Sequence, residues 1–294
     1  MNRKGIILAG GTGSRLRPIT LGICKQLLPI FDKPLVYYPL SVLMLAGIRD
    51  LLIISTPRDR AAFEGLLGDG NEFGLRIQYA VQPSPEGLPQ AFTIAADCGF
   101  LAPGDHSAMI LGDNLFYGHD LPSILQRAGS DSDGATIFSY PVANPSEFGV
   151  VETDDDGNVV SMTEKPTEPK SNRAVCGLYF FDSHVTQVAR RLRPGPRGEL
   201  EMVDLLRHYL DGDTLHVHHL GRGTAWLDTG TPASLLAAAQ FVETLQTRQG
   251  LLVACPEEIA WNNGWIDTRQ LRERINQLAG SKYADYLQSI MHPT

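Results

Sequence analysis

Short apolar runs bounded by turn residues alternate with amphipathic stretches over the first 140 residues of the chain. The runs have the length of strands that are buried on both faces of a sheet, and the stretches between them show helical spacing. We expect strands at 5–9, 51–55, 77–81, 107–111 and 136–140, and helices at 36–46, 59–67, 89–98 and 121–128. This alternation is typical of βαβ units, which place ligands at the carboxyl ends of the strands.

The pattern changes after residue 140. Two short runs flank the turn sequence DDDGN and predict a hairpin, and further strands, helices and two polar-faced terminal helices follow. These elements are expected at 149–152, 159–163, 174–181, 201–210, 214–220, 224–227, 233–246 and over the last ~40 residues. We predict an α/β, Rossmann-like fold with an open mixed, mostly parallel sheet, flanking helices, a β insertion and a helical C-terminal tail. Because no linker or repeat divides the chain, 1–294 is interpreted as one domain with parts at about 1–140, 141–230 and 231–294.

The composition of the chain argues against several classes of function and location. The chain has 294 residues and a formal net charge of −8, which argues against nucleic acid or an anionic membrane as a partner. No apolar run is long enough to span a membrane, and the opening run is too short for a secretory signal. The four cysteines stand singly, so a disulfide scaffold is not expected and a cytoplasmic location is predicted.

A glycine-rich loop directly follows the first predicted strand, in the sequence IILAGGTGSRLRPIT. Without Cβ groups, the backbone N–H groups of such a loop can close around an anion. A dinucleotide fingerprint and a Walker P-loop both fail here, because the third glycine of the first and the GK[ST] of the second are missing. The nearby cations Arg15 and Lys25 favour a phosphate site, and the alternative is a surface turn with two solvated charges.

Two carboxylates stand at the carboxyl ends of apolar strands, Asp113 in LGDN and Asp228 in AWLDTG. Together they suit Mg²⁺, which uses one or two carboxylates plus substrate phosphates. The alternative is that each aspartate caps a turn or a helix. Lys165, in the sequence EKP, is placed near a strand end where a lysine can bind phosphate as a point charge.

Several blocks in fixed order resemble the short sugar-1-phosphate nucleotidylyltransferases over the whole chain, and among them the glucose-1-phosphate thymidylyltransferase family. The blocks include GIILAGGTGSRLRPIT, LGDNLFYGHDL, EKPTEPKSN, RGELEMVDL, AWLDTGT and CPEEIAW. The resemblance implies transfer of a thymidylyl group from dTTP to α-D-glucose 1-phosphate, giving dTDP-glucose and pyrophosphate for deoxysugar biosynthesis. It also implies Mg²⁺-assisted in-line attack on the α-phosphate, a sugar-binding role for the β insertion and a homotetramer.

The resemblance also assigns roles to individual residues. It implies catalytic roles for Arg15, Lys25 and Lys165, and metal binding by Asp113 and Asp228. The nucleotide would be bound by Gly10, Gly11, Gly13, Arg15, Lys25, Gln82, Gly87 and Asp113. The sugar phosphate would be bound by Asn114, Gly149, Glu164, Lys165 and Val175. A second, regulatory nucleotide site would use Gly118, His119, Arg222 and Glu258, and Asn262 stands where the family usually has an arginine.

Two other functions remain open from the sequence. The first is a UTP-preferring or sugar-promiscuous relative, since one methyl group offers only ~1–3 kcal/mol of discrimination between the two pyrimidines. The second is a non-catalytic nucleotide-binding regulator. The joint presence of the cations Arg15, Lys25 and Lys165 with the two aspartates disfavours the regulator.

Overall fold

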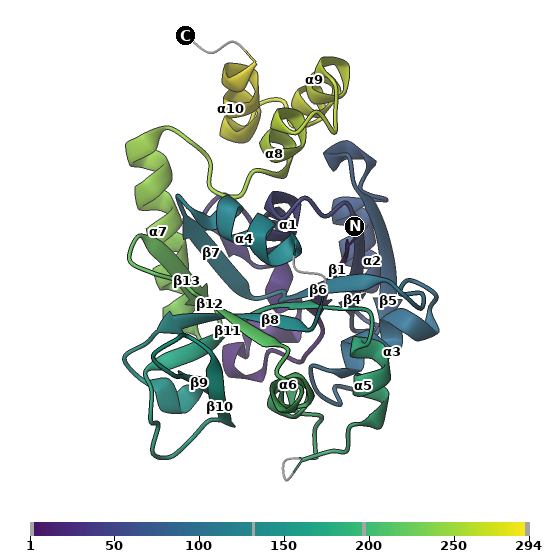
Figure 1. Ribbon diagram of the computed structural model, residues 1–294. Helices are drawn as coiled ribbons and strands as arrows, with labels where there is room; N and C mark the ends of the chain where they lie inside the picture. The colour runs from purple at the N-terminus through teal and green to yellow at the C-terminus, as the bar shows by residue number, and fades with distance from the viewer. Residues whose placement is uncertain (1–2, 131–132, 196–197, 292–294) are drawn as a thin grey trace.

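The computed structural model describes residues 3–130, 133–195 and 198–291, and it is built around one large mixed sheet with helices on both faces (Figure 1). The path of the sheet is β10-β9-β11-β6-β1-β4-β5, and β8 pairs with both β11 and β12. Its strands are β1 (Arg3–Ala9), β4 (Asp50–Ser55), β5 (Arg76–Val81), β6 (His106–Leu111), β8 (Ala135–Pro141), β9 (Gly149–Thr153), β10 (Val159–Glu164), β11 (Arg173–Phe181) and β12 (Leu215–His219).

The N-terminal part of this sheet is parallel. β1 lies between β4 and β6, with Gly5 opposite Leu51 on one side and opposite Ala108 on the other, and β4 pairs in turn with β5. The predicted strands of this part are confirmed to within two residues. The parallel arrangement brings the carboxyl ends of β1 and β6 to the same edge.

The remainder of the sheet is mostly antiparallel and is organised around β11. This strand pairs with β6 through Leu178 and Ile110, with β8 through Tyr179 and Ile137, and with β9 through Ala174 and Val150. The hairpin β9–β10 extends the sheet beyond it. The predicted mixed sheet and β insertion are therefore confirmed.

A second, two-stranded sheet consists of β7 (Asn114–Gly118) and β13 (Thr224–Asp228). The strands are antiparallel, and Asp228 lies opposite Asn114. The sequence analysis did not predict β7, because its five residues begin only two positions after β6 ends and include Asn114 and Gly118, so they carry little strand pattern of their own. Another short pair, β2 (Pro29–Ile30) and β3 (Lys33–Pro34), follows the glycine-rich loop.

Ten α-helices lie within the described residues. They are α1 (Tyr37–Leu45), α2 (Arg60–Leu67), α3 (Gln90–Asp97), α4 (Leu121–Ser130), α5 (Val185–Arg191), α6 (Met202–Asp211), α7 (Pro232–Gln249), α8 (Pro256–Asn262), α9 (Thr268–Gln277) and α10 (Lys282–Ile290). None of these helices is both long and apolar enough to cross a membrane. The two predicted terminal helices are confirmed as α9 and α10, whereas α5 and α8 were not predicted.

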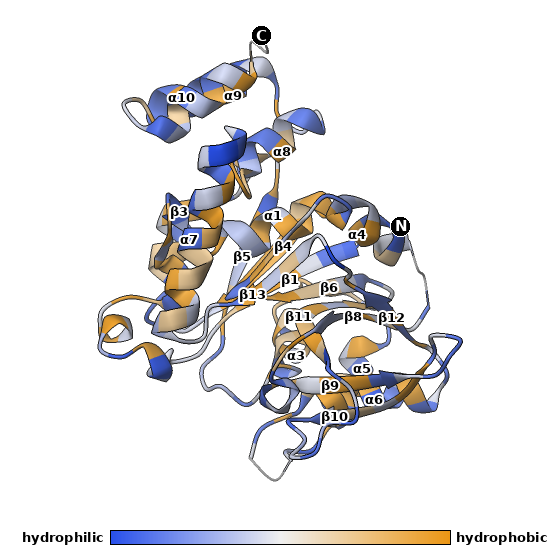
Figure 2. Cartoon of the chain, turned by 90° about the vertical axis from the view of Figure 1, so that its left-hand side faces the viewer, coloured by the Kyte–Doolittle hydropathy of each residue, from blue (hydrophilic) through white to orange (hydrophobic). Residues whose placement is uncertain are grey.

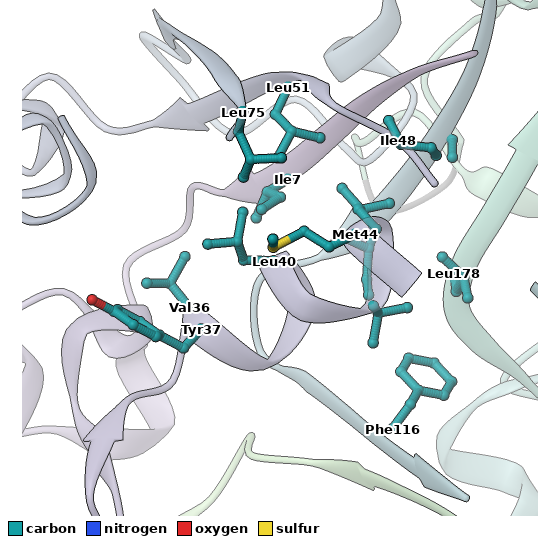
Figure 3. Packing of buried hydrophobic residues seen from close by; sticks show 14 of the residues in the cluster. Ile7, Val36, Tyr37, Leu40, Met44, Ile48, Leu51, Leu75, Phe116 and Leu178 are labelled. Carbon is teal, nitrogen blue, oxygen red and sulfur yellow. The ribbon is translucent and has the colours of Figure 1, made fainter. Parts of the chain in front are cut away.

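The largest hydrophobic cluster surrounds α1, whose residues 37–44 are all buried. A helix that is apolar on every side belongs inside a protein, and Figure 3 shows Leu40 and Met44 beside Ile7 of β1. Leu178 of β11 and Phe116 of β7 lie on the other side of the helix in the same view. The sheet and β7 are thereby held in a fixed relation, which positions the residues at their ends.

The C-terminal helices are joined to one another through buried polar contacts. Glu257 of α8 is fully buried, and it accepts hydrogen bonds from Arg274 Nε at 2.9 Å and from the Tyr283 hydroxyl at 2.6 Å. Arg274 also donates to Glu72 at 2.8 Å, outside the tail. In Figures 1 and 2, α9 and α10 lie at the opposite end of the molecule from the hairpin β9–β10.

Candidate active site

A cavity of about 720 Å³ lies at the carboxyl ends of β1 and β6 and extends to the hairpin β9–β10. This volume is within the range of small-molecule sites. Most of the residues proposed from the sequence line it, although they come from segments far apart in the chain. They are Gly10, Gly11, Arg15, Gln82, Gly87, Asp113, Asn114, Gly149, Glu164, Lys165, Val175 and Asp228.

The glycine-rich loop forms one wall of this cavity. Gly11 has a φ of 106° and Gly13 a φ of 57°, which are conformations that favour glycine. At Gly10 a Cβ atom would lie 2.2 Å from Oε1 of Gln82, so only glycine allows that amide to approach the loop. Gly13 does not line the cavity, and its carbonyl accepts a hydrogen bond from the Thr20 hydroxyl at 2.8 Å, which fixes the turn.

Two loops meet over the nucleotide side of the cavity. Gly87 forms a parallel bridge to Leu200, and the Leu200 N–H donates to the Glu86 carbonyl at 2.7 Å. A Cβ atom at Gly87, whose φ is 116°, would lie 2.1 Å from the Leu200 carbonyl oxygen. The glycine is therefore required for the contact itself, and the contact joins the predicted base-binding loop to the segment before α6.

The two predicted metal-binding aspartates lie side by side. Asp113 stands two residues after the end of β6, and Asp228 ends β13 opposite Asn114, the neighbour of Asp113. The described residues contain no group of three or more His, Cys, Asp and Glu side chains that could hold a metal ion. A pair of hard oxygen ligands instead fits Mg²⁺, which fills its other positions with phosphate oxygens and water.

Each of these carboxylates has a cation beside it. Lys25 Nζ lies 2.5 Å from Asp113 Oδ2, and the lysine side chain is only 9% exposed. Lys25 itself does not line the cavity, whereas Arg15 does. An Arg15 guanidinium nitrogen and Asp228 Oδ2 each lie 3.0 Å from the point where a Cβ atom on Gly230 would stand.

Asn114 connects residues that are predicted to bind the metal with residues that are predicted to bind the sugar phosphate. The side chain is buried; its amide nitrogen donates to Asp113 Oδ1 at 2.8 Å, and its oxygen accepts from Trp226 Nε1 at 2.6 Å. The same oxygen accepts from the Gly177 N–H at 3.3 Å. The sequence analysis did not assign Trp226 a role, because its proximity to Asn114 depends on pairing between strands more than 100 residues apart.

The hairpin β9–β10 forms the opposite wall. Gly149 lies opposite Glu164, and a Cβ atom at Gly149 would lie 3.1 Å from Glu164 Oε2, so the glycine leaves room for that carboxylate. Lys165 follows with a φ of 45°, and its N–H donates to the Phe148 carbonyl at 3.0 Å. The side chains of Glu164 and Lys165 therefore both line the cavity from one fixed hairpin end.

Further residues line the cavity without having been predicted. Phe148 packs on Trp226 with ring centroids 5.4 Å apart, and the carboxylates of Glu199 and Glu201 line the cavity from the segment before α6. The block RGELEMVDL was one of the signals of resemblance, so it could have indicated the two glutamates. The sequence contains no local signal for Phe148, because its place depends on how the hairpin folds over the cavity.

The four residues proposed for regulation come from different elements. Gly118 lies opposite Thr224 at the far end of β7–β13 from Asp228, and the backbone places His119 and Arg222 in the segments next to it. Glu258 lies on α8, where it accepts a hydrogen bond from the Tyr286 hydroxyl at 2.8 Å. Burial raises the pKa of Glu258 above its ordinary value.

Comparison with known proteins agrees with this geometry. Residues 4–244 match the nucleotidyl transferase family. A glucose-1-phosphate thymidylyltransferase of Xanthomonas campestris pv. campestris (strain B100) is 56% identical over 98% of this chain and 97% of its own. One from Mycobacterium tuberculosis (strain ATCC 25618 / H37Rv) is 54% identical over 98% of this chain and 99% of its own.

Two solved structures have similar folds. One is a Bacillus anthracis protein described as a glucose-1-phosphate thymidylyltransferase in complex with sucrose, with a TM-score of 0.74 and 36% identity over 81% of this chain and 94% of that one. The other is a UDP-glucose pyrophosphorylase complexed with UDP-glucose, with a TM-score of 0.71 and 25% identity over 83% of this chain and 100% of that one. The family match over most of the length, the near-full-length relatives and the shared fold establish that the chain belongs to the nucleotidyl transferase family.

Proposed function

We propose that this protein transfers a thymidylyl group from dTTP to α-D-glucose 1-phosphate, giving dTDP-glucose and pyrophosphate. The observation that carries the proposal is that one cavity places Arg15, Asp113 and Asp228 opposite Glu164 and Lys165. The first group suits a triphosphate with its metal, and the second suits a phosphate attached to a polyol. The activity named for the full-length relatives supports this choice of substrates.

The chemistry needs no general base. The second pKa of a phosphate monoester is ~6, so the attacking oxygen of the sugar phosphate is already largely ionised at neutral pH. The barrier instead comes from bringing two polyanions together in line, while negative charge grows on the bridging oxygens. Fixed positive charges are the means of lowering it.

The residues of the cavity divide this work. Arg15 and Lys25 would hold the phosphates of the nucleotide and neutralise the departing pyrophosphate, and Lys165 would hold the attacking phosphate. Asp113 and Asp228 would hold Mg²⁺, which screens the charge of the triphosphate when bound. These roles rest on the position of each side chain in or beside the cavity.

Recognition of the two organic groups would fall to the cavity walls. Gln82 offers an amide to the edge of the pyrimidine, with Gly10, Gly11, Gly13 and Gly87 shaping the surrounding backbone. On the sugar side, Glu164 would accept hydrogen bonds from sugar hydroxyls, with Asn114, Gly149 and Val175 around it. The nucleotide part would then span about 1–140 and the sugar part about 141–230, within one functional unit.

A second candidate is a UTP-preferring or sugar-promiscuous enzyme. The observation that favours it is the similarity to a UDP-glucose pyrophosphorylase complexed with UDP-glucose. The C5-methyl group of thymine changes binding by only ~1–3 kcal/mol, so a preference for dTTP needs a measurement.

The experiment is a product assay over four nucleoside triphosphates and several hexose 1-phosphates, in the presence of Mg²⁺. We expect pyrophosphate release and dTDP-glucose, identified by mass spectrometry, with dTTP and glucose 1-phosphate as the most efficient pair. A higher kcat/KM with UTP would establish the second candidate, and no release with any pair would contradict both. The Asp228→Asn variant is the matched control, since it keeps the side-chain shape and removes one carboxylate.

The resemblance supports further expectations that belong to this proposal. They are a homotetramer, and an effector site near Gly118, His119, Arg222 and Glu258 that binds dTDP-sugars. Neither nucleic acid nor a membrane is proposed as a partner, because the chain carries a net charge of −8.

A further inference from the structure

Both oxygens of the Asp113 carboxylate accept a hydrogen bond from a neighbouring side chain. Its Oδ2 is 2.5 Å from Lys25 Nζ, and its Oδ1 accepts from the Asn114 amide at 2.8 Å. The Lys25 side chain is 9% exposed and that of Asp113 is 27% exposed, so the lysine reaches this carboxylate from below the cavity surface. A cation that approached Asp113 from the cavity would find one carboxylate oxygen already paired with a positive charge.

The second carboxylate also has a cation in its vicinity, without a direct ion pair among the described residues. Asp228 Oδ2 and the Arg15 guanidinium both lie 3.0 Å from the same point beside Gly230. The two aspartates and the two cations together have no net charge. If a divalent cation alone took both carboxylates, Lys25 would be left in a buried position without its counter-ion, which is strongly unfavourable.

A nucleoside triphosphate changes this balance. Its phosphate oxygens can accept the ammonium of Lys25 and the guanidinium of Arg15, which leaves the carboxylates for the metal. The ion pair between Lys25 and Asp113 is then exchanged for pairs with the ligands, and no charge remains unpaired. Such an exchange is favourable only when both ligands arrive.

We infer that the ammonium group of Lys25 blocks metal binding by the Asp113 carboxylate until the phosphates of a nucleotide bind that ammonium group instead. Metal and nucleotide therefore bind this protein cooperatively. The inference rests on the proposed function to the extent that the ligands are a nucleoside triphosphate and a divalent cation. By reciprocity, the factor by which nucleotide raises the affinity for metal is the factor by which metal raises the affinity for nucleotide. Lys25 thus has a role before the reaction begins, in addition to any role in the transition state.

The test measures Mn²⁺, as a paramagnetic probe for the Mg²⁺ site, binding to the full-length protein without nucleotide or sugar phosphate. Free Mn²⁺ is determined by electron paramagnetic resonance for the wild type, Lys25→Met and Lys165→Met. We expect Lys25→Met to bind Mn²⁺ at least about tenfold more tightly than the wild type, since an uncharged side chain leaves Asp113 free. Lys165→Met is the matched control, because it removes one lysine charge from the cavity wall without freeing Asp113.

The outcomes separate the inference from a general charge effect. A gain in Lys25→Met alone supports it, and equal gains in both variants, or none in either, overturn it. Should Lys25→Met fail to fold, Lys25→Gln takes its place. Wild-type crystals soaked with Mn²⁺ give an independent measurement. We expect an anomalous peak at Asp113 only when dTTP is added, and a strong peak with millimolar Mn²⁺ alone would overturn the inference.

These measurements involve no turnover. A wrong assignment of nucleotide or sugar would appear in the product assay, whereas a wrong inference about Lys25 would appear in the Mn²⁺ titration. The two failures can therefore be distinguished.

Discussion

At the scale of single residues, the site depends on polar side chains that make several hydrogen bonds at once. Asn114 is the example, because its amide contacts Asp113, Trp226 and the backbone of β11 at the same time. Gly177 makes this possible, since a Cβ atom there would lie 2.7 Å from the Asn114 oxygen. The arrangement makes Asn114 a positioning residue for the Asp113 carboxylate and for the cavity wall at Gly177 of β11.

The first prediction concerns this residue. Asn114→Ala removes the donor to Asp113 and leaves the indole N–H of Trp226 without its partner. Loss of a hydrogen bond to a charged group costs about 1.5–3 kcal/mol, so we expect kcat to fall roughly tenfold to a hundredfold and the Mg²⁺ requirement to rise. Steady-state kinetics at varied Mg²⁺ measure both. Unchanged Mg²⁺ dependence with a lower melting temperature would show that the role of Asn114 is only structural.

The second prediction separates the two phosphate-binding cations of the cavity. Lys165→Ala is expected to raise the KM for sugar 1-phosphate by tenfold or more, with a smaller effect on the KM for dTTP, because it lies on the hairpin side. Arg15→Ala is expected to do the reverse, because it lies beside Asp228. Initial rates with each substrate varied in turn measure the effects, and each variant serves as the control for the other. The opposite pattern would show that the two roles are exchanged.

At the scale of elements, polar junctions hold the strands and helices of the sugar side together. Asp182 directly follows β11 and accepts hydrogen bonds from the Gly134 N–H before β8, the His184 N–H before α5 and the Tyr209 hydroxyl of α6. Burial raises the pKa of Asp182, but these hydrogen bonds lower it by more, and the net pKa lies below its ordinary value. Folding thus favours the ionised form.

The third prediction follows from the sign of that shift. A depressed pKa in the folded state stabilises the protein at all pH values above the ordinary aspartate pKa of about 4, and this stabilisation is lost as the pH falls through the folded value. Asp182→Asn should therefore unfold about 1–3 kcal/mol more easily at pH 7. The difference from the wild type should narrow below about pH 4.

Urea denaturation monitored by circular dichroism at several pH values measures this difference. Asp155→Asn, in the exposed turn of the hairpin β9–β10, is the control and should change stability little at any pH. If Asp182→Asn were equally destabilised at pH 7 and at pH 3.5, its charge would not be the cause.

Elements also show how far the sequence predicts the structure. The runs that became β1 and β4 are continuous and apolar because both faces of these strands are buried, so their identity is encoded locally. Because ligands bind at the carboxyl ends of parallel strands, Asp113 and the glycine-rich loop were then expected at the same edge of the sheet. In contrast, α8 has seven residues and α5 has seven, and segments this short carry little periodicity.

The sequence predicts those residues of the candidate site that lie next to a recognisable strand or loop. It does not predict residues whose place in the site depends on contacts between distant segments. Arg15, Asp113 and Lys165 stand next to strands or loops that can be recognised in the sequence. Trp226 contacts Asn114 through the pairing of β7 and β13, and the contact of Gly87 with Leu200 joins segments more than 100 residues apart. Neither contact leaves a pattern in a single sequence.

At the scale of the whole molecule, one small sheet connects two regions. The pair β7–β13 carries Asn114 and Asp228 at one end, and at the other end Gly118 with the adjacent segments of His119 and Arg222. Four residues of strand separate the ends by roughly 13 Å. A ligand bound at the far end would therefore act on the end that carries Asn114 and Asp228 through a single short sheet.

The fourth prediction concerns such a ligand. The family usually has an arginine at the position of Asn262, and an arginine binds phosphate with two hydrogen bonds that a neutral asparagine cannot replace. We therefore expect dTDP-rhamnose to inhibit this protein weakly. Loss of one charge-assisted contact corresponds to roughly a tenfold to hundredfold weaker affinity. Inhibition curves for the wild type and Asn262→Arg measure this, with stronger inhibition expected in the variant. Noncompetitive inhibition of the wild type at low micromolar concentration would contradict the prediction.

The position of β11 limits which segments of this enzyme can be exchanged with those of its relatives to make chimeric proteins. Although β11 follows the hairpin β9–β10 in the chain, it returns to the middle of the sheet and pairs with β6 on one side and β8 on the other. If all residues after β8 were replaced by those of a homologue, β11 would be replaced as well. This central strand would then come from a protein whose β6 and β8 differ from those of this chain. The hairpin 149–164 lies at the edge of the sheet, so it can be replaced without changing the central strands. It is therefore the segment to exchange between homologues when the proposed sugar preference is to be altered.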